Sequence, residues 1–367
     1  MTGQMFSGAV AIGLGLVVGF LLFVPFVAIA YRRRGHLSFG RLLLWGAALI
    51  YFWAIWTYTL LPLPDGDDIR CVGMVTDPLE IVRELRGTLS QGSRFVRDPA
   101  FLQIALNVVL FLPLGFFVRV LGGRGIFVAF AAGLGLSMFV ETTQLTGVWG
   151  LYPCAYRVFD VGDLMTNTLG ALVGSVIGFI VPRVHRGSAK ASDADAPRPV
   201  TKGRRALAML CDGIAFALIG YVAGVGVAAV RLYLLELPQD ASDGTLVSFW
   251  STLGTAAIWL IVVLATGQTI GDATVRLRYR GGRVPQPIAR LLRWAAGYAG
   301  ISLLGLFVPL AVPALVFASI LLLLFTRRGR GLPGLVSGQQ LTDSREKPAP
   351  APEHSADAEP DRVTSMS

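Results

Sequence analysis

Long apolar runs constrain this chain more than any other feature of its sequence. They are long enough to cross a bilayer as helices, which takes about 20 apolar residues each, and arginine-rich segments separate several of them. Within a bilayer, only helices and closed barrels satisfy their own backbone polar groups. The sequence therefore predicts an all-α fold, a polytopic transmembrane helical bundle with five N-terminal spans and three or four C-terminal spans.

The charge of the chain fits a membrane protein better than a nucleic-acid-binding protein. Only 15% of the residues are charged, against about a quarter in a soluble domain. The formal net charge is +9, but the arginines lie in short tracts between apolar runs, where they set membrane topology. No basic patch is interleaved with aromatic residues that would stack on bases. We therefore expect membrane lipid as a partner, and no nucleic acid.

The first five apolar runs predict a membrane domain over residues 1–182. The first run, 6–31, carries no charge and three arginines follow it, so we place the N-terminus outside a bacterial plasma membrane and these arginines in the cytoplasm. Alternation then makes the polar loop 62–100 extracytoplasmic, with a short amphipathic helix over 79–89. The five spans are expected at residues 6–31, 41–61, 101–121, 126–145 and 161–181.

A polar segment over residues 183–203 is expected to be a flexible cytoplasmic linker, because small, charged and proline residues dominate it. A second membrane domain follows over 204–337, with spans at 206–232 and 248–266. The tail, 338–367, lacks apolar residues for a core and is predicted to be disordered and cytoplasmic.

Two stretches of the second domain leave their structure open. Residues 275–278 alternate apolar and basic side chains, which fits either a short strand or the start of a helix. The apolar run 295–325 is long for one span and contains Pro309 and Pro313. One tilted helix and two short helices folded at the prolines are both compatible with it. We favour the hairpin, because it keeps the following arginines in the cytoplasm.

Polar residues at the outer ends of the fourth and fifth spans form the main candidate site. Ionisable groups at the end of an apolar span are costly to bury unless they are paired or functional. Glu141 and Gln144 lie one helical turn apart, and a helix that begins by Asp160 would place Asp163 and Asn167 on the same stripe. The polar cluster, as we name it, comprises Asn107, Glu141, Gln144, Arg157, Asp160, Asp163 and Asn167. Its asparagine in the third span also fits a simpler role as a hydrogen-bonding contact between helices.

Cysteine and histidine are too scarce for a metal centre or a disulfide-rich scaffold. The predicted topology places Cys71 and Cys154 on the same outer side, where they are a candidate disulfide in an oxidising compartment. The acidic residues 65–68 resemble part of a calcium loop, but the remaining ligand spacing is missing. We expect neither a metal nor a cofactor.

A pattern of motifs in the first half of the chain resembles the VanZ-like family. Residues 107–117 place an asparagine before Pro-Leu-Gly, 137–144 contain Glu-x-x-Gln, and 157–174 contain Arg-x-x-Asp-x-x-Asp-x-x-x-Asn-x-x-Gly. The family name comes from low-level resistance to the lipoglycopeptide teicoplanin. The resemblance therefore implies work at the cell envelope, without a defined chemical step.

Residues 204 to about 340 resemble the RDD family of small membrane domains. Arg205, Ala208 and Asp212 match its opening Arg-x-x-Ala-x-x-x-Asp. Its Gly-Gln-Thr-x-Gly turn is matched by Gly267, Gln268, Thr269 and Gly271, and its later arginine-bearing segment by residues 290–293. Some RDD-like proteins resemble ion transporters. The resemblance therefore implies ion transport as one expectation for this half of the chain.

The match to the RDD family is incomplete at two positions. Asp272 stands where the family often has a basic residue. Gly334 stands at about the place of a usual aspartate. These departures weaken any transport role taken from that family.

Three functions follow as hypotheses. The polar cluster would bind a lipid-linked cell-wall intermediate or a lipophilic antibiotic such as a lipoglycopeptide. Alternatively, Glu141 and Asp163 would act as acid and base of a membrane enzyme, with Arg157 holding an anionic substrate. A third hypothesis is ion or proton transport through the second domain, centred on Asp212. A buried network that only satisfies its own charges explains the same residues, so enzymatic activity stays open.

Overall fold

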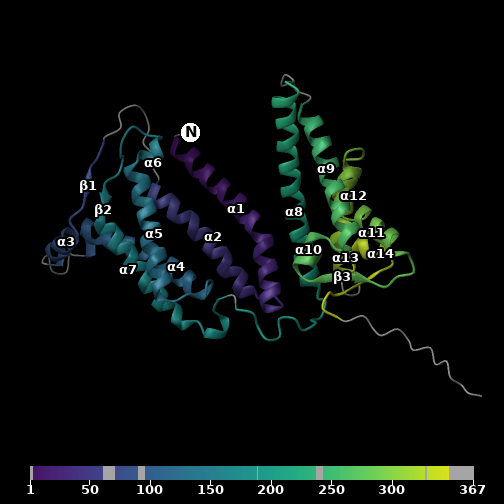
Figure 1. Ribbon diagram of the computed structural model, residues 1–367, viewed down its shortest axis with the longest axis horizontal. Helices are drawn as coiled ribbons and strands as arrows, with labels where there is room; N and C mark the ends of the chain where they lie inside the picture. The colour runs from purple at the N-terminus through teal and green to yellow at the C-terminus, as the bar shows by residue number, and fades with distance from the viewer. Residues whose placement is uncertain are drawn as a thin grey trace, which may run out of the picture.

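The computed structural model describes residues 3–60, 71–89, 96–187, 189–236, 243–326 and 329–346. Two groups of helices lie side by side, joined by the linker, and the fold is an all-α polytopic bundle (Figure 1). Among the described residues, 6 helical runs are long and apolar enough to cross a membrane. They are Phe39–Leu60, Pro99–Val120, Ile126–Leu145, Val161–Ile180, Lys202–Leu234 and Gly244–Thr266.

The first group contains the elements predicted for the N-terminal domain, with ends that differ from the predicted spans by a few residues. Its helices are α1 (Gly3–Arg34), α2 (Phe39–Leu60), α3 (Glu80–Leu89), α4 (Pro99–Val120), α5 (Ile126–Leu145), α6 (Gly147–Gly150) and α7 (Val161–Ile177). Two short strands, β1 (Met74–Val75) and β2 (Phe159–Asp160), pair in parallel. Residues 65–68 lie outside the described residues.

The second group follows the linker. Its helices are α8 (Lys202–Ala229), α9 (Asp243–Thr266), α10 (Ile270–Thr274), α11 (Gln286–Ala295), α12 (Tyr298–Gly305), α13 (Ala311–Phe325) and α14 (Gly331–Val336). Its strands β3 (Leu277–Arg280) and β4 (Gln340–Asp343) form an antiparallel pair. A turn over 306–310 divides the long apolar run into α12 and α13, which is the folded arrangement that we favoured over one tilted helix.

Small residues bring α4 and α7 into close backbone contact. A side chain added at Gly115 would collide with the backbone of Ala171, and one at Gly174 would collide with the carbonyl of Leu112. Gly133 of α5 also lies against Ala171, at its side chain. Small residues permit this approach, which in a bilayer provides packing where the hydrophobic effect does not. The three helices therefore form a close-packed platform beneath the polar cluster.

Residues 340–343 are ordered, so the predicted boundary of the tail is wrong. Leu277 is opposite Asp343, and Arg280 is opposite Gln340. Leu341 and Asp343 are fully buried. The second half of the alternating stretch 275–278 thus begins strand β3, after a turn over 275–276, and its partner comes from the stretch that we expected to be disordered. The rest of the tail, 347–367, lies outside the described residues.

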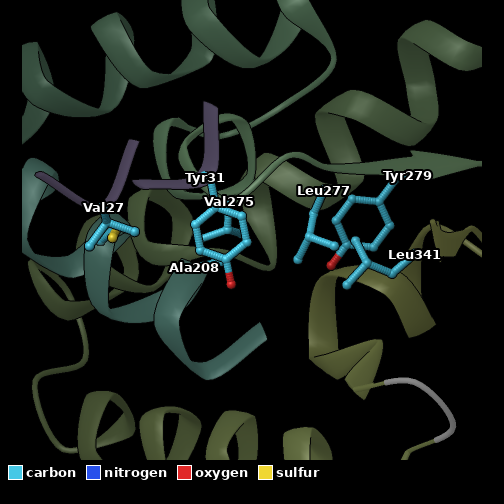
Figure 2. Packing of buried hydrophobic residues seen from close by; sticks show 8 residues of the cluster. Val27, Tyr31, Ala208, Val275, Leu277, Tyr279 and Leu341 are labelled. Carbon is cyan, nitrogen blue, oxygen red and sulfur yellow. The ribbon is translucent and has the colours of Figure 1, made fainter. Parts of the chain in front are cut away.

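Helix α1 contributes to the core of the second group as well as packing against α2. Val27 and Tyr31 lie against Ala208, Val275 and Leu277 in one buried cluster (Figure 2). The free Cys211 is buried in the same cluster. The N-terminal helix therefore connects the two predicted domains.

The linker also makes fixed contacts, where we expected flexibility. The backbone N–H of Ala191 donates to the Arg33 carbonyl at 2.7 Å. Ala194 is completely buried. The backbone N–H of Arg198 donates to Asp343 at 3.0 Å. The described linker is thus attached to the end of α1 and to β4.

Candidate functional site

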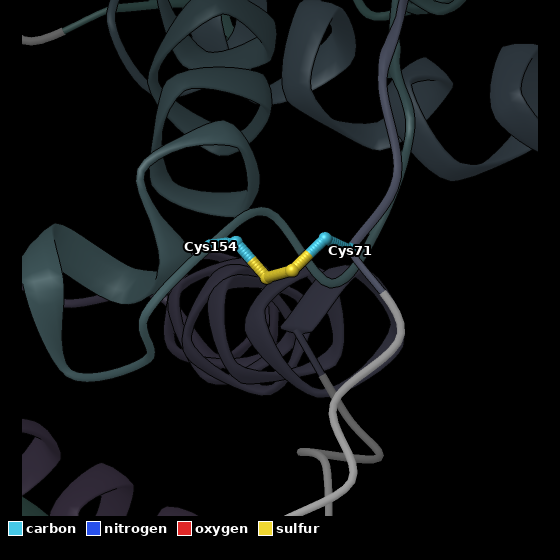
Figure 3. The surroundings of a disulfide bond; sticks show 2 residues. All are labelled: Cys71 and Cys154. Carbon is cyan, nitrogen blue, oxygen red and sulfur yellow. A yellow bond between two sulfur atoms is a disulfide. The ribbon is translucent and has the colours of Figure 1, made fainter.

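A disulfide joins the polar loop to the segment that precedes α7. Cys71 and Cys154 are bonded, with their Cα atoms 5.6 Å apart (Figure 3). Beyond the bond, β1 pairs with β2, so that Val75 is opposite Asp160. The side chain of Ile81 in α3 approaches Gly162 at the start of α7. Residues 71–81 therefore cover the end of α7 that carries the polar cluster.

Asp160 caps helix α7 and does not belong to its first turn. Its backbone is extended, and its carboxylate accepts the N–H of Gly162 at 2.7 Å. Aspartate is favoured at this position because it satisfies a free helical N–H. The prediction that Asp160, Asp163 and Asn167 share one helical stripe is thus wrong for Asp160, because α7 begins at Val161. Asp163 and Asn167 remain on the same face.

Hydrogen bonds connect the two carboxylates of the cluster to neighbouring elements. The amide of Asn107 donates to Asp163 at 2.6 Å, linking α4 to α7. The backbone N–H of Asp160 donates to Glu141 at 3.1 Å. The guanidinium of Arg157 lies within electrostatic range of Glu141. Asn107 thus forms the helix-to-helix contact that its sequence position allowed, and it does so through a cluster carboxylate.

The remaining two cluster residues bond to partners that sequence reasoning did not identify. Gln144 donates its amide to the carbonyl of Thr59 at the end of α2, at 2.5 Å. Asn167 donates to Ser137 of α5 at 2.9 Å, and its own side-chain oxygen is buried without a partner. Every residue has a backbone carbonyl, so the sequence could not single out that of Thr59 as the acceptor. A single serine such as Ser137 in an apolar helix also does not predict a specific hydrogen bond.

Burial divides the polar cluster into a closed part and an accessible part. Glu141 is 3% exposed, and Gln144 and Asn167 are similarly buried. By contrast, Asn107, Arg157, Asp160 and Asp163 are only partly buried. The structure therefore brings all seven predicted residues to one end of the α4–α5–α7 platform. Asp163 and Arg157 belong to its accessible part, with Glu141 in its interior.

Residues 48–182 match the family model VanZ/LLP1. This part of the chain is thus similar to VanZ-like membrane domains, and we call it the VanZ-like part. The match contains the whole polar cluster, the disulfide and the α4–α5–α7 platform, and it begins after α1. It supports a membrane protein of the cell envelope. No curated protein and no solved structure gives a significant match to the chain.

The second group, outside the VanZ-like part, has a separate cluster of buried charges. Asp212 of α8 accepts hydrogen bonds from the Thr269 hydroxyl at 2.8 Å and the Gly271 N–H at 2.6 Å. Gly271 must be small, since an added Cβ would meet the backbone of Ala208. Arg205 pairs with Asp272 at 2.5 Å, and both side chains are buried. The structure thus unites the predicted Arg205, Asp212, Thr269 and Gly271.

Asp272 stands where the RDD family often has a basic residue, and here its carboxylate belongs to the buried charge cluster. Its second oxygen is buried without a partner. Gly334, the other departure, lies against Arg330 and Tyr279. The predicted Gln268 and Gly267 lie at the edge of the cluster, where Gln268 donates to the Leu277 carbonyl at 2.5 Å.

A cavity of about 310 Å³ adjoins these charges. Its walls include Arg205, Asp212, Thr269, Asp272, Trp259 and Trp294.

A second buried ion pair fixes the β3–β4 strands. Arg204 pairs with Asp343 at 2.8 Å, and Arg345 pairs with the same carboxylate at 2.6 Å. Burial opposes ionisation of Asp343. Hydrogen bonds from Arg345, from the Arg198 N–H and from Arg204 outweigh it and hold the carboxyl pKa well below its usual value. In the same strand pair, burial raises the pKa of Tyr279 to about 12. The lowered pKa of Asp343 means that its carboxylate stays ionised and stabilises the position of β4.

Proposed function

We propose that the VanZ-like part acts at the outer face of a bacterial plasma membrane by binding the polar head of a lipid-linked or lipophilic ligand at the polar cluster. The observation that carries the proposal is the partial exposure of Asp163 and Arg157, of opposite charge, at the end of a platform of apolar helices. A ligand with an apolar tail would lie along the helices and place its polar head against these groups.

The cover over the cluster supports binding of a ligand by a preformed site. The disulfide and the β1–β2 pair fix residues 71–75 beside Asp160. A fixed cover lowers the entropy that must be lost on binding. A disulfide also fits an oxidising compartment outside the cytoplasm. Tolerance to the lipoglycopeptide teicoplanin is the phenotype that we expect from this site.

The proposal is tested in bacteria that express the full chain at matched levels. Asp163→Asn and Glu141→Gln preserve side-chain size but remove the charge, so both should abolish any teicoplanin tolerance that the wild type confers. Glu80→Gln is the control, because Glu80 is an exposed carboxylate of α3 outside the cluster. Unchanged tolerance in both cluster variants would argue against a ligand site there.

A membrane enzyme is the second candidate for the same residues. It is favoured by two carboxylates of unequal exposure, Glu141 and Asp163, on adjacent helices, with Arg157 nearby. In that case purified protein would convert a lipid-linked substrate, and both Glu141→Gln and Asp163→Asn would abolish turnover without abolishing binding. Binding without turnover by the wild type would support the accessory role instead.

Transport through the second group is a separate proposal. The buried Asp212 and the unpartnered oxygen of Asp272 adjoin the 310 Å³ cavity, which favours passage or binding of a cation there. Ion flux into liposomes, compared between the wild type and Asp212→Asn, tests it. Equal flux in the two proteins would remove Asp212 as the carrier.

A further inference from the structure

An arginine-lined cavity of about 220 Å³ lies between β3 and α11, next to the buried charge cluster of the second group, with which it shares Tyr279 and Arg293. Its lining includes Arg278, Arg280, Arg290 and Arg293, together with Tyr279 and Gln286. No carboxylate contributes to the described lining. The four arginines come from two separate stretches of the sequence, and only the fold gathers them into one cavity. We name this cavity the arginine pocket.

Three of the four arginines of the pocket lack the carboxylate partners that other arginines of this half possess, whereas Arg293 lies within electrostatic range of Asp272. Arg204 and Arg205 each pair with a buried aspartate. Within the described part of the chain, Arg278, Arg280 and Arg290 have no carboxylate within ion-pairing distance. Like charges that converge in a concave site raise the local attraction for an anion.

Two of these arginines also present unused donors. Arg293 is 6% exposed; its Nη1 donates to the Gly267 carbonyl at 3.0 Å, but its Nε is buried without an acceptor. Arg290 donates from Nη1 to the Leu264 carbonyl at 2.5 Å, and its Nε is likewise buried without an acceptor. A buried donor without an acceptor costs free energy that a bound anion would recover.

The surroundings of the pocket indicate a membrane interface. Helix α11 is amphipathic, and its Ile288 and Leu291 are 50% and 46% exposed. Arg290 and Arg293 are one turn apart on a different face of this helix, which lines the pocket. A helix of this kind lies in the plane of the membrane interface, with its apolar side toward the acyl chains. Lipid phosphates occupy the same depth.

We propose that the arginine pocket binds a phosphate group, supplied by an anionic phospholipid headgroup or by free phosphate. Guanidinium groups bind phosphate oxygens in pairs through parallel N–H donors. The volume of about 220 Å³ is smaller than the 300–1,000 Å³ of sites that enclose drug-sized molecules. The pocket would therefore hold a headgroup and leave acyl chains beside Ile288 and Leu291.

The test uses the full chain in nanodiscs of neutral phosphatidylcholine. Short-chain phosphatidylglycerol, short-chain phosphatidylcholine and inorganic phosphate are titrated separately, and binding is followed by calorimetry. Arg280→Gln is the principal variant, because no hydrogen bond or ion pair of its side chain would be lost from the described fold. Arg283→Gln is the matched control, since it removes the same charge from an exposed neighbour that does not line the pocket.

We expect saturable binding that Arg280→Gln weakens about fivefold, the order expected for one basic residue at a lipid surface, and that Arg283→Gln leaves unchanged. Tighter binding of phosphatidylglycerol than of phosphate would identify a lipid headgroup. Equal binding of the two would identify free phosphate as sufficient. Absence of saturable binding, or equal weakening by both variants, would overturn the proposal.

Discussion

The two carboxylates of the polar cluster and two buried carboxylates of the second group have different hydrogen-bond partners. In the VanZ-like part, an amide and a backbone N–H donate to the two carboxylates Asp163 and Glu141. In the second group, arginines pair directly with Asp272 and Asp343. The amide of Asn107 and the backbone N–H of Asp160 carry no formal charge, whereas an arginine brings the opposite charge to its carboxylate. We expect the first arrangement to leave a carboxylate open to a charged ligand, and the second to stabilise the position of one element against another.

Breaking the Arg204–Asp343 pair should have the largest effect. Asp343→Asn leaves a buried arginine without its counter-charge, which should lower the free energy of unfolding of the second group by about 3–5 kcal/mol. Cys211 provides the measurement, because it is buried and not disulfide-bonded. A thiol-reactive dye should label it at a lower temperature in the variant.

The control for this prediction is Asp195→Asn. Asp195 forms ion pairs with Lys190 and Arg276, but its side chain is 57% exposed. An ion pair this exposed is screened by solvent and contributes little to stability, so the labelling midpoint should hardly move. Equal shifts of the labelling midpoint in the two variants would show that the buried Asp343 pair stabilises the fold no more than the exposed Asp195 pairs.

Removing the disulfide should destabilise the VanZ-like part and spare the second group. The double change Cys71→Ser and Cys154→Ser opens a loop with a sequence separation of 83 residues, which should cost about 2–4 kcal/mol. The intrinsic fluorescence transition should shift to lower temperature, while labelling of Cys211 keeps its midpoint. A parallel shift of both signals would mean that the two halves unfold together.

Packing of α4 against α7 is tested by a pair of glycine substitutions. Gly174→Ala places a methyl group against the carbonyl of Leu112 and should destabilise the VanZ-like part by about 1–3 kcal/mol. Gly135→Ala meets no described atom within 4 Å and should be neutral or slightly stabilising, because alanine favours helix. The midpoint of thermal denaturation should therefore fall for Gly174→Ala and stay the same or rise slightly for Gly135→Ala.

Acid should weaken the second group through Asp343. The pKa of this carboxyl is lower in the folded protein than its ordinary value, so its stabilising effect is present above the unfolded pKa of about 4 and is lost as the pH falls below it. The Cys211 labelling midpoint should drop progressively as the pH falls from about 5 toward the lowered pKa of Asp343. Asp343→Asn should remove most of this pH dependence. If the labelling midpoint of the variant fell with pH as steeply as that of the wild type, Asp343 would not be the group responsible.

The sequence predicted the all-α class, since long apolar runs identify the long helices to within a few residues. It also grouped the seven residues of the polar cluster. It did not show that Asp160 lies outside α7, because an aspartate at the start of an apolar run fits both the N-cap and the first turn of the helix. Nor did it reveal β4: residues 340–343 are polar in composition, and only the antiparallel partner β3 and the pairing of Asp343 with Arg204 make them ordered.

The most direct test of the polar cluster is binding of teicoplanin by the purified chain in nanodiscs. The wild type and the control Glu80→Gln should bind it saturably with equal affinity. Asp163→Asn should bind at least about tenfold more weakly, the loss expected when one charged hydrogen-bonding partner is removed, while retaining the thermal transition of the wild type. Equal affinity in all three proteins, or no saturable binding by the folded wild type, would contradict the proposed role of the cluster.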